Sequence, residues 1–175
     1  MLPVFNLVPS LKSRIDRDNE QLLRLTEDQR AFLNYAENLE RARVDGVAGS
    51  GKTLLAVEQA RRYAVSGKRT LMLCYNKSLA TWIGNALNTD EVENQVEVRT
   101  FHGFCASACA QANVEFTPDS SDNFWTEHTA ELLSETSHLI DPFDAIVVDE
   151  GQDFRETWWI AIEDCLAEDA ISFPK

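Results

Sequence analysis

The residues Gly46-Val47-Ala48-Gly49-Ser50-Gly51-Lys52-Thr53 decide the fold, because they match the phosphate-loop pattern G-x-x-x-x-G-K-[ST]. Glycines let consecutive backbone N–H groups in such a loop point at phosphate oxygens, and the next helix adds its dipole. The lysine neutralises the β- and γ-phosphates, and the final hydroxyl coordinates Mg²⁺. The alternative is a glycine-rich turn that binds nothing. We favour a site for ATP and Mg²⁺ formed by Gly46, Ala48, Gly49, Ser50, Gly51, Lys52 and Thr53.

Strands and helices alternate on both sides of this loop. Short apolar or β-branched runs predict strands at 43–45, 69–75, 96–100 and 145–149. Periodic apolar residues predict helices at 25–43, 52–66, 78–87, 102–112, 124–139 and 154–168. Gly67 is placed to end the second helix in a left-handed conformation. This alternation indicates an α/β fold, so we expect a parallel sheet flanked by helices.

Two carboxylates, Asp149 and Glu150, follow the apolar run 145–148. After a strand of this kind, Asp149 can hold Mg²⁺, and Glu150 can orient or deprotonate an attacking water. Two acids after an apolar run often mark only a strand end that faces solvent. Because a phosphate-loop pattern precedes them in an α/β chain, we favour the catalytic interpretation.

The string 149–154 (DEGQDF) resembles the DExQD motif of UvrD/Rep-like superfamily 1 DNA helicases. The resemblance covers about residues 25–160. Within it, 25–29 (LTEDQ) is similar to the segment that reads adenine, 75–80 (YNKSLA) to motif Ia and 99–103 (RTFHG) to motif Ib. The sequence of these motifs is most similar to that of helicases with a nuclease-related domain.

This resemblance implies a P-loop, RecA-like domain of a hydrolase that couples ATP hydrolysis to movement along single-stranded DNA. Lys52, Asp149, Glu150 and Gln152 would carry catalysis, with Gln152 linking the γ-phosphate to the DNA-binding segments. Gln29 would read adenine. The family's DNA contacts would fall on Tyr75, Asn76, Lys77, Thr100, Phe101 and His102.

Several of these residues also have a purely structural interpretation. Thr26 and Gln29 form the pattern of a helix capping box. Tyr75 and Phe101 are either core aromatics or surfaces on which bases stack, and the polar neighbours of Phe101 favour stacking for it. Lys77 contacts either phosphate or solvent alone.

A zinc site is a weaker possibility. His102, Cys105 and Cys109 share a helix face, but no fourth ligand accompanies them, so we interpret the cysteines as buried small residues. Trp158 and Trp159 are adjacent and point in different directions on a helix, so they cannot both be core residues.

The family pattern extends beyond what this chain provides. We expect a lead-in segment at 1–24 and a partial domain at 25–175, with a short insertion at 104–144. We find no strand with a third motif after the acidic strand, and no second motor domain with its arginines. We therefore expect a fragment that hydrolyses ATP poorly alone, since such arginines contribute about 10³–10⁵ in rate. A sheet without that strand should also be less stable, with an exposed edge.

The charge of the chain does not decide whether its partner is a nucleic acid. The net charge of −13 argues against nucleic acid, yet residues 1–82 carry a net +4 and residues 83–175 a net −17. Single-stranded DNA could meet the basic half. The rival hypotheses are an ATPase that does not act on DNA and a nucleotide-binding interaction module. Cysteines without disulfide-like spacing and the absence of a long apolar run predict a cytoplasmic protein with no membrane partner.

Overall fold

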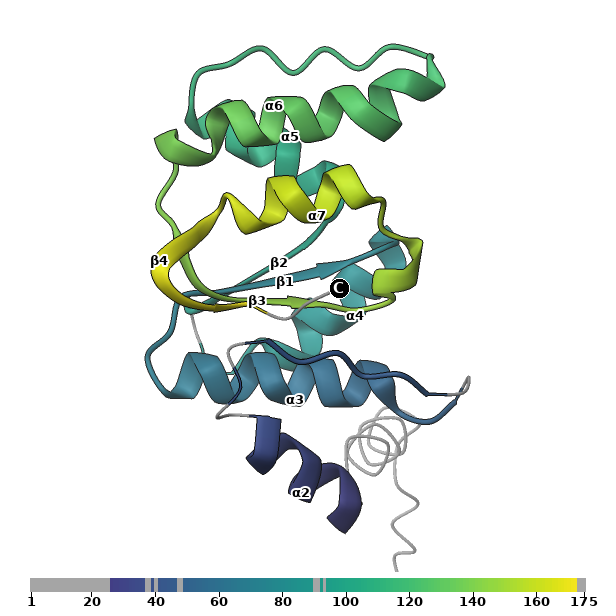
Figure 1. Ribbon diagram of the computed structural model, residues 1–175, viewed down its shortest axis with the longest axis vertical. Coiled ribbons are helices and arrows are strands. Elements are labelled where there is room, and N and C mark those ends of the chain that lie inside the picture. The colour runs from purple at the N-terminus through teal and green to yellow at the C-terminus, as the bar shows by residue number, and fades with distance from the viewer. Residues whose placement is uncertain are drawn as a thin grey trace, which may run out of the picture.

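The computed structural model describes residues 26–36, 39, 41–46, 49–89, 92 and 94–172. Within these residues, a sheet of four parallel strands in the order β2-β1-β3-β4 is flanked by helices (Figure 1). The α/β fold with a parallel sheet is therefore confirmed. The strands are β1 (Thr70–Cys74), β2 (Val96–Thr100), β3 (Phe143–Val148) and β4 (Leu166–Ser172).

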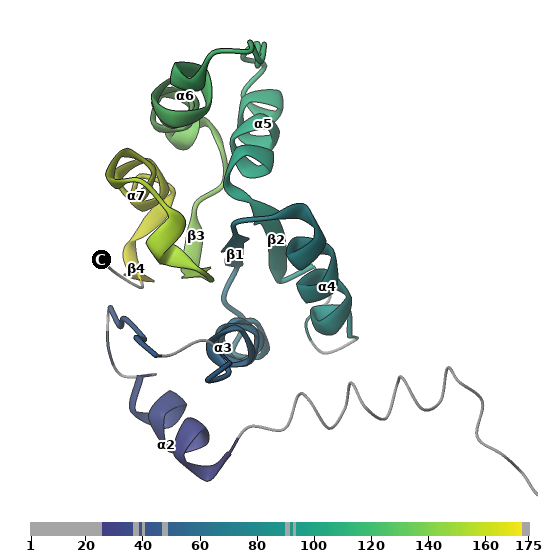
Figure 2. The ribbon, with the colours of Figure 1, turned by 90° about the vertical axis from the view of Figure 1, so that its right-hand side faces the viewer.

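The helices form a layer on each side of the sheet (Figure 2). One layer holds α3 (Lys52–Val65) and α4 (Lys77–Leu87), with α2 (Glu27–Ala36) packed outside α3. The other layer holds α5 (Phe101–Gln111), α6 (Thr129–Thr136) and α7 (Glu156–Glu163). Short turns of helix lie at Phe124–His128, Ser137–Leu139 and Gly151–Asp153.

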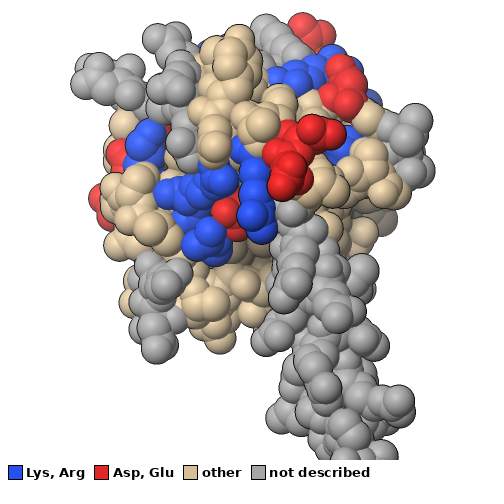
Figure 3. All heavy atoms as spheres, turned by 90° about the horizontal axis from the view of Figure 1, so that it is seen from below, with Lys and Arg blue, Asp and Glu red and all other residues tan. Residues whose placement is uncertain are grey.

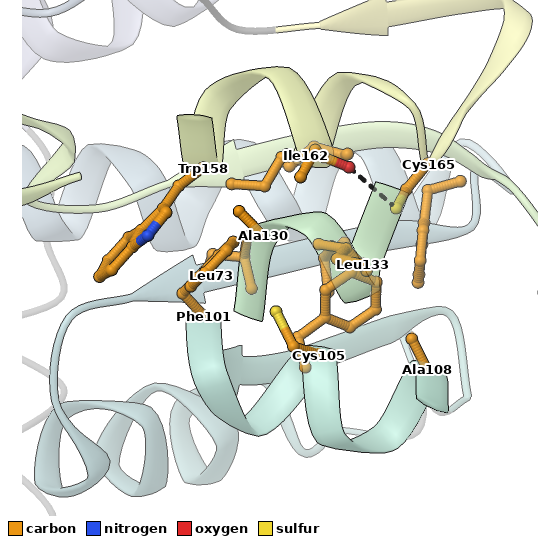
Figure 4. Packing of buried hydrophobic residues seen from close by; sticks show 14 of the residues in the cluster. Leu73, Phe101, Cys105, Ala108, Ala130, Leu133, Trp158, Ile162 and Cys165 are labelled. Atoms are coloured by element: carbon orange, nitrogen blue, oxygen red, sulfur yellow. Dashed lines mark hydrogen bonds between the residues drawn. The ribbon is translucent and has the colours of Figure 1, made fainter. Parts of the chain in front are cut away.

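Strand β1 lies in the interior because both of its faces are covered. Leu71 and Leu73 point into the cluster under α5, α6 and α7, whereas Met72 and Cys74 point into the cluster under α3 and α4. This alternation follows from the two-residue period of a strand. Figure 4 shows the first cluster, in which side chains of α5, α6 and α7 meet over the sheet.

The helix ends follow their local sequence. Helix α3 ends at Val65, and Gly67 follows it with a φ of 83°. The N–H groups of Gly67 and Lys68 donate to the carbonyls of Ala64 and Tyr63 at 2.9 and 3.0 Å. The predicted left-handed stop is confirmed. Helix α2 ends at Ala36, and the predicted helix 124–139 is divided into three short helical segments. No helix in the described part of the chain has the length and apolar character needed to cross a bilayer.

The strand predicted at 43–45 is wrong, since the described residues 41–46 form neither strand nor helix. Arg43 pairs with Asp45 at 3.0 Å, and Arg41 pairs with Glu163 of α7 at 3.0 Å. Val44, between Arg43 and Asp45, is 36% exposed. Charged residues that pair with each other at the surface do not enter a sheet buried on both faces.

The helix predicted at 154–168 is also wrong beyond Glu163. Residues 166–172 instead form β4, which runs parallel to β3 with Phe143 opposite Leu166 and Ala145 opposite Ile171. Leu, Ala and Glu favour helix locally, but the edge of β3 offers backbone partners that outweigh this preference. We expected no strand with a third motif after the acidic strand; a strand does follow it, and it extends the sheet beyond β3.

Candidate functional site

Most of the motif residues lie along one edge of the sheet. Because the strands are parallel, their carboxyl ends meet there. The register sets Leu73 beside Val148 and Cys74 beside Thr100. The carboxylates that follow β3 and the loop that precedes α3 meet at this edge, as the hydrogen bond between Asp149 and the side chain of Thr53 shows.

The described residues of the loop, 46 and 49–53, have the backbone that the glycines predict. Gly49 and Gly51 have φ values of 78° and 86°, in the left-handed region that favours glycine. A Cβ on Gly46 would lie 2.7 Å from Ser50 Oγ, so a side chain at this position would require the Ser50 hydroxyl to move. Lys52 Nζ donates a hydrogen bond of 2.7 Å to the Gly46 carbonyl and so lies across its own loop. Ala48, a predicted nucleotide contact, lies outside the described residues.

Asp149 is a buried carboxylate, one oxygen of which is unpartnered within the described part of the chain. Its side chain is 3% exposed, and its Oδ2 atom has no hydrogen-bond partner among the described residues. Burial raises the pKa of Asp149 above its ordinary value. The hydrogen bond from Thr53 opposes this rise, the negative charge of Glu150 adds to it, and the positive charge of Lys52 opposes it.

This arrangement fits a hard divalent cation. An unpartnered carboxylate oxygen beside a hydroxyl group is the donor set that Mg²⁺ takes when phosphate and water supply its other ligands. No group of three or more His, Cys, Asp or Glu suited to a metal occurs in the described ranges.

The next three residues form a tight turn that points two polar side chains into the site. Glu150 has a φ of 55°, which is unusual for a residue with a side chain. Gln152 Nε2 donates a short hydrogen bond to Glu150 Oε2. Both residues line the same pocket as Lys52 and Asp149. The carboxylate of Glu150 is thus held by its own turn.

Gln29 contacts the phosphate-loop motif directly. The capping box is confirmed, since Thr26 N donates to Gln29 Oε1 at 2.9 Å and Gln29 N donates to Thr26 Oγ1 at 3.2 Å. Gln29 Nε2 donates to the Ser50 carbonyl at 3.1 Å, and a Cβ on Gly51 would lie 2.7 Å from this nitrogen. Sequence reasoning missed this contact, since no pattern signals that α2 packs against the loop.

A pocket of about 210 Å³ adjoins the loop, between α2, α3, α7 and the end of β3. The polar side chains of Lys52, Asp149, Glu150 and Gln152 lie on it. Its other walls are mainly apolar. They include Phe32, Leu33, Ala36, Leu55, Ala56, Val147 and Trp159.

The motif Ia residues follow β1 at the same edge. Tyr75 is 57% exposed, so the alternative of a core aromatic does not describe it. Asn76 caps α4, because its side chain accepts a hydrogen bond of 2.8 Å from Leu79 N. Lys77 is exposed, and no ion pair within the described residues involves it. These three residues are accessible to a ligand.

The motif Ib residues are more deeply placed. Thr100 caps α5 by accepting a hydrogen bond of 3.2 Å from Gly103 N. Phe101 is 2% exposed and stacks on Trp158, with ring centroids 4.3 Å apart and planes 8° apart. Phe101 therefore lies in the core. From its polar neighbours we had favoured a surface on which bases stack. His102 Nε2 lies 2.8 Å from the Trp125 carbonyl.

Of the remaining sequence candidates, two cysteines and one tryptophan lie in the core. Cys105 and Cys109 are buried, and burial raises the pKa of both thiols, which does not favour metal binding. Trp158 is buried, whereas Trp159 is only partly buried and lines the pocket. The prediction that the two tryptophans cannot both be core residues is confirmed.

The basic side chains gather on the side of the molecule where α2 and α3 lie (Figure 3). On α3, Arg61 and Arg62 pair with Glu58 at 2.7 and 3.2 Å. Burial alone would raise the pKa of Glu58, but the hydrogen bonds and charges of the two arginines lower it. Part of the positive charge on this face is therefore balanced within the helix.

The fold and the site define an α/β domain with a four-stranded, all-parallel sheet flanked by helices and with carboxylates at the carboxyl edge of that sheet. Comparisons of the chain with protein-family models, with curated proteins and with solved structures found no match.

Proposed function

We propose that this chain binds ATP and Mg²⁺ as the first motor domain of a UvrD/Rep-like DNA helicase, which couples ATP hydrolysis to movement along single-stranded DNA. The observation that carries the proposal is the buried Asp149 oxygen that has no partner among the described residues and lies beside the Thr53 hydroxyl. A buried carboxylate oxygen of this kind lowers the stability of a domain unless a ligand completes it. The motif sequence 149–154 supports the helicase class.

Each residue of the proposed site would have a role that follows from the chemistry of its side chain. Lys52 would leave the Gly46 carbonyl to neutralise phosphate charge, and Asp149 with Thr53 would hold Mg²⁺. The ion, when bound, offsets negative charge on the phosphate oxygens. Glu150, held by Gln152, would orient or deprotonate the attacking water.

The test is Mg²⁺-dependent binding of a fluorescent ATP analogue to the full chain. Lys52→Ala should weaken binding by a factor of about ten or more, since a lost charged contact of about 1.4 kcal/mol corresponds to tenfold in Kd. Asp149→Asn should remove the dependence on Mg²⁺. Lys68→Ala is the matched control, because Lys68 lies before β1 at the opposite edge of the sheet. An unchanged Kd for Lys52→Ala would contradict the proposed phosphate site.

A second candidate is an ATPase that does not act on DNA. The net charge of −17 on residues 83–175 and the burial of Phe101 favour it. Stimulation of ATP hydrolysis by single-stranded DNA, measured on the chain joined to a second motor domain, would separate the two. If single-stranded DNA does not stimulate hydrolysis, the helicase proposal is wrong, but the proposed nucleotide site is unaffected.

A further inference from the structure

One contact of the carboxylate turn comes from outside the sequence motif. The Trp159 ring packs against Gly151, the middle residue of the turn 150–152, so closely that a Cβ on Gly151 would lie 2.9 Å from Trp159 Cζ2 and 3.2 Å from Cη2. Side chains do not tolerate the shorter of these distances. Gly151 and Trp159 are therefore complementary in size.

The conformation of this turn needs support. Glu150 adopts a left-handed φ of 55°, which a residue with a side chain adopts only when its surroundings hold it there. Two backbone hydrogen bonds close the turn, from Asp153 N to the Glu150 carbonyl at 2.9 Å and from Phe154 N to the Gly151 carbonyl at 3.2 Å. Both bonds lie on the side of the turn that leads to α7, the helix that carries Trp159.

Trp159 connects the turn to the rigid core. Its ring contacts Phe154 with centroids 5.6 Å apart, and Phe154 in turn contacts Phe101 and Trp158 at 6.1 and 5.5 Å. The last three rings are buried in the cluster that Figure 4 shows in part. Trp159 itself remains partly exposed and lines the pocket together with Glu150 and Gln152.

We propose that Trp159 is a positioning residue that fixes the turn 150–152, and thereby sets the place of the Glu150 carboxylate and the Gln152 amide beside the phosphate loop. The inference rests on the proposed nucleotide site for its role in hydrolysis. It also makes a claim about the turn that holds without nucleotide. The two claims are tested separately.

The first experiment measures the turn alone, by amide hydrogen exchange of Asp153 and Phe154 in the full chain without nucleotide. Trp159→Leu should speed the exchange of both amides by about tenfold or more, since local opening exposes them. Trp159→Phe, which keeps an aromatic ring, should restore part of the protection. Trp82→Leu is the control, because Trp82 is a partly exposed tryptophan of α4 in the other layer. Equal protection in Trp159→Leu and wild type would overturn the inference.

The second experiment measures single-turnover ATP hydrolysis and the Kd for Mg²⁺-ATP. Gly151→Ala and Trp159→Leu should each slow hydrolysis by about tenfold while Kd changes less than about twofold, which separates positioning from binding. The double variant should be no slower than either single variant, because leucine leaves room for the new methyl group. Additive losses, or losses of rate that follow only the folded fraction, would overturn the inference.

The outcomes separate this inference from the proposed function. If wild type does not bind Mg²⁺-ATP, the proposed function fails, and Trp159 loses its role in hydrolysis. If wild type binds Mg²⁺-ATP but the variants alter neither exchange nor rate, the positioning role fails while the nucleotide site stands. If turnover is too slow to measure, the exchange of the two amides alone decides.

Discussion

Asp149 shows how burial of a single carboxylate changes the pH dependence of stability. Its pKa is raised by burial, so the folded state holds a proton that the unfolded state releases between the ordinary value of 3.8 and the raised folded value. In this pH window the unfolded state binds fewer protons, and stability therefore falls as pH rises. Above the raised pKa, the ionised carboxylate lowers the stability of the nucleotide-free domain.

Asp149→Asn should therefore raise the melting temperature of the nucleotide-free protein at pH 7, and the gain should shrink as pH falls through the raised pKa. Mg²⁺ should add to the stabilisation by ATP in wild type but not in the variant. Thermal unfolding between pH 4 and pH 8 measures both effects. Asp122→Asn, at an exposed position, is the control. A variant less stable than wild type at pH 7 would show that the carboxylate has partners that stabilise it.

Gln59 carries a similar cost with no evident role in the motifs. It is 3% exposed on α3, and neither Nε2 nor Oε1 has a hydrogen-bond partner among the described residues. Gln59→Leu should stabilise the domain by about 1 kcal/mol, because an unsatisfied buried polar group costs about 1–3 kcal/mol. Urea unfolding measures the change, with the exposed Gln111→Leu on α5 as control. A loss of stability in Gln59→Leu would reveal a partner for the amide.

The sequence predicts the members of the site better than their contacts. Thr53 and Asp149 could be paired from the two motifs, since the chemistry of phosphate and Mg²⁺ requires both at one strand edge. The contact between Gln29 and Ser50 and the contact between Gly151 and Trp159 could not be predicted. They depend on how α2 and α7 pack, which no local pattern specifies.

Among the elements, the interior strands were the most predictable. β1 and residues 145–148 of β3 are buried or partly buried and almost wholly apolar, because helices cover both of their faces. The errors fall outside these strands, at 43–45 and at β4. The segment 43–45 is short and charged, and the sequence of β4 favours a helix. Whether such a segment pairs with a strand depends on the neighbouring parts of the fold and not on its own sequence. β4 pairs with β3, so β3 lies inside the described sheet and not at its edge.

Two substitutions of Asn76 distinguish its role as the cap of α4 from its predicted role in binding DNA. Asn76→Ala should lower the free energy of unfolding by about 1 kcal/mol, the usual cost of a lost N-cap. Asn76→Asp keeps the cap and should keep this stability, yet its negative charge should weaken binding of single-stranded DNA. Chemical unfolding and a fluorescent oligonucleotide titration measure the two effects. Equal DNA affinity in wild type and Asn76→Asp would remove Asn76 from the predicted DNA contacts.

At the scale of the whole molecule, the charge distribution constrains where DNA can lie. The chain carries a net −13, and its acidic residues are concentrated in 83–175. A phosphate backbone is therefore repelled at long range and attracted only where local positive charge is unbalanced. On α3 the arginines already pair with Glu58, whereas Lys77 begins α4 beside exposed Tyr75.

Lys77 should accordingly contribute to the salt dependence of DNA binding. If Lys77 contacts one phosphate, Lys77→Ala should reduce the slope of log K against log salt by about 0.7 for single strands. Lys68→Ala should leave the slope unchanged, because Lys68 lies at the opposite edge of the sheet with its amine over the Tyr63 ring. Oligonucleotide titrations at several salt concentrations measure both slopes. Equal slopes in wild type and Lys77→Ala would mean that DNA, if bound, does not lie along this edge, and the ATPase without a DNA partner would become the better proposal.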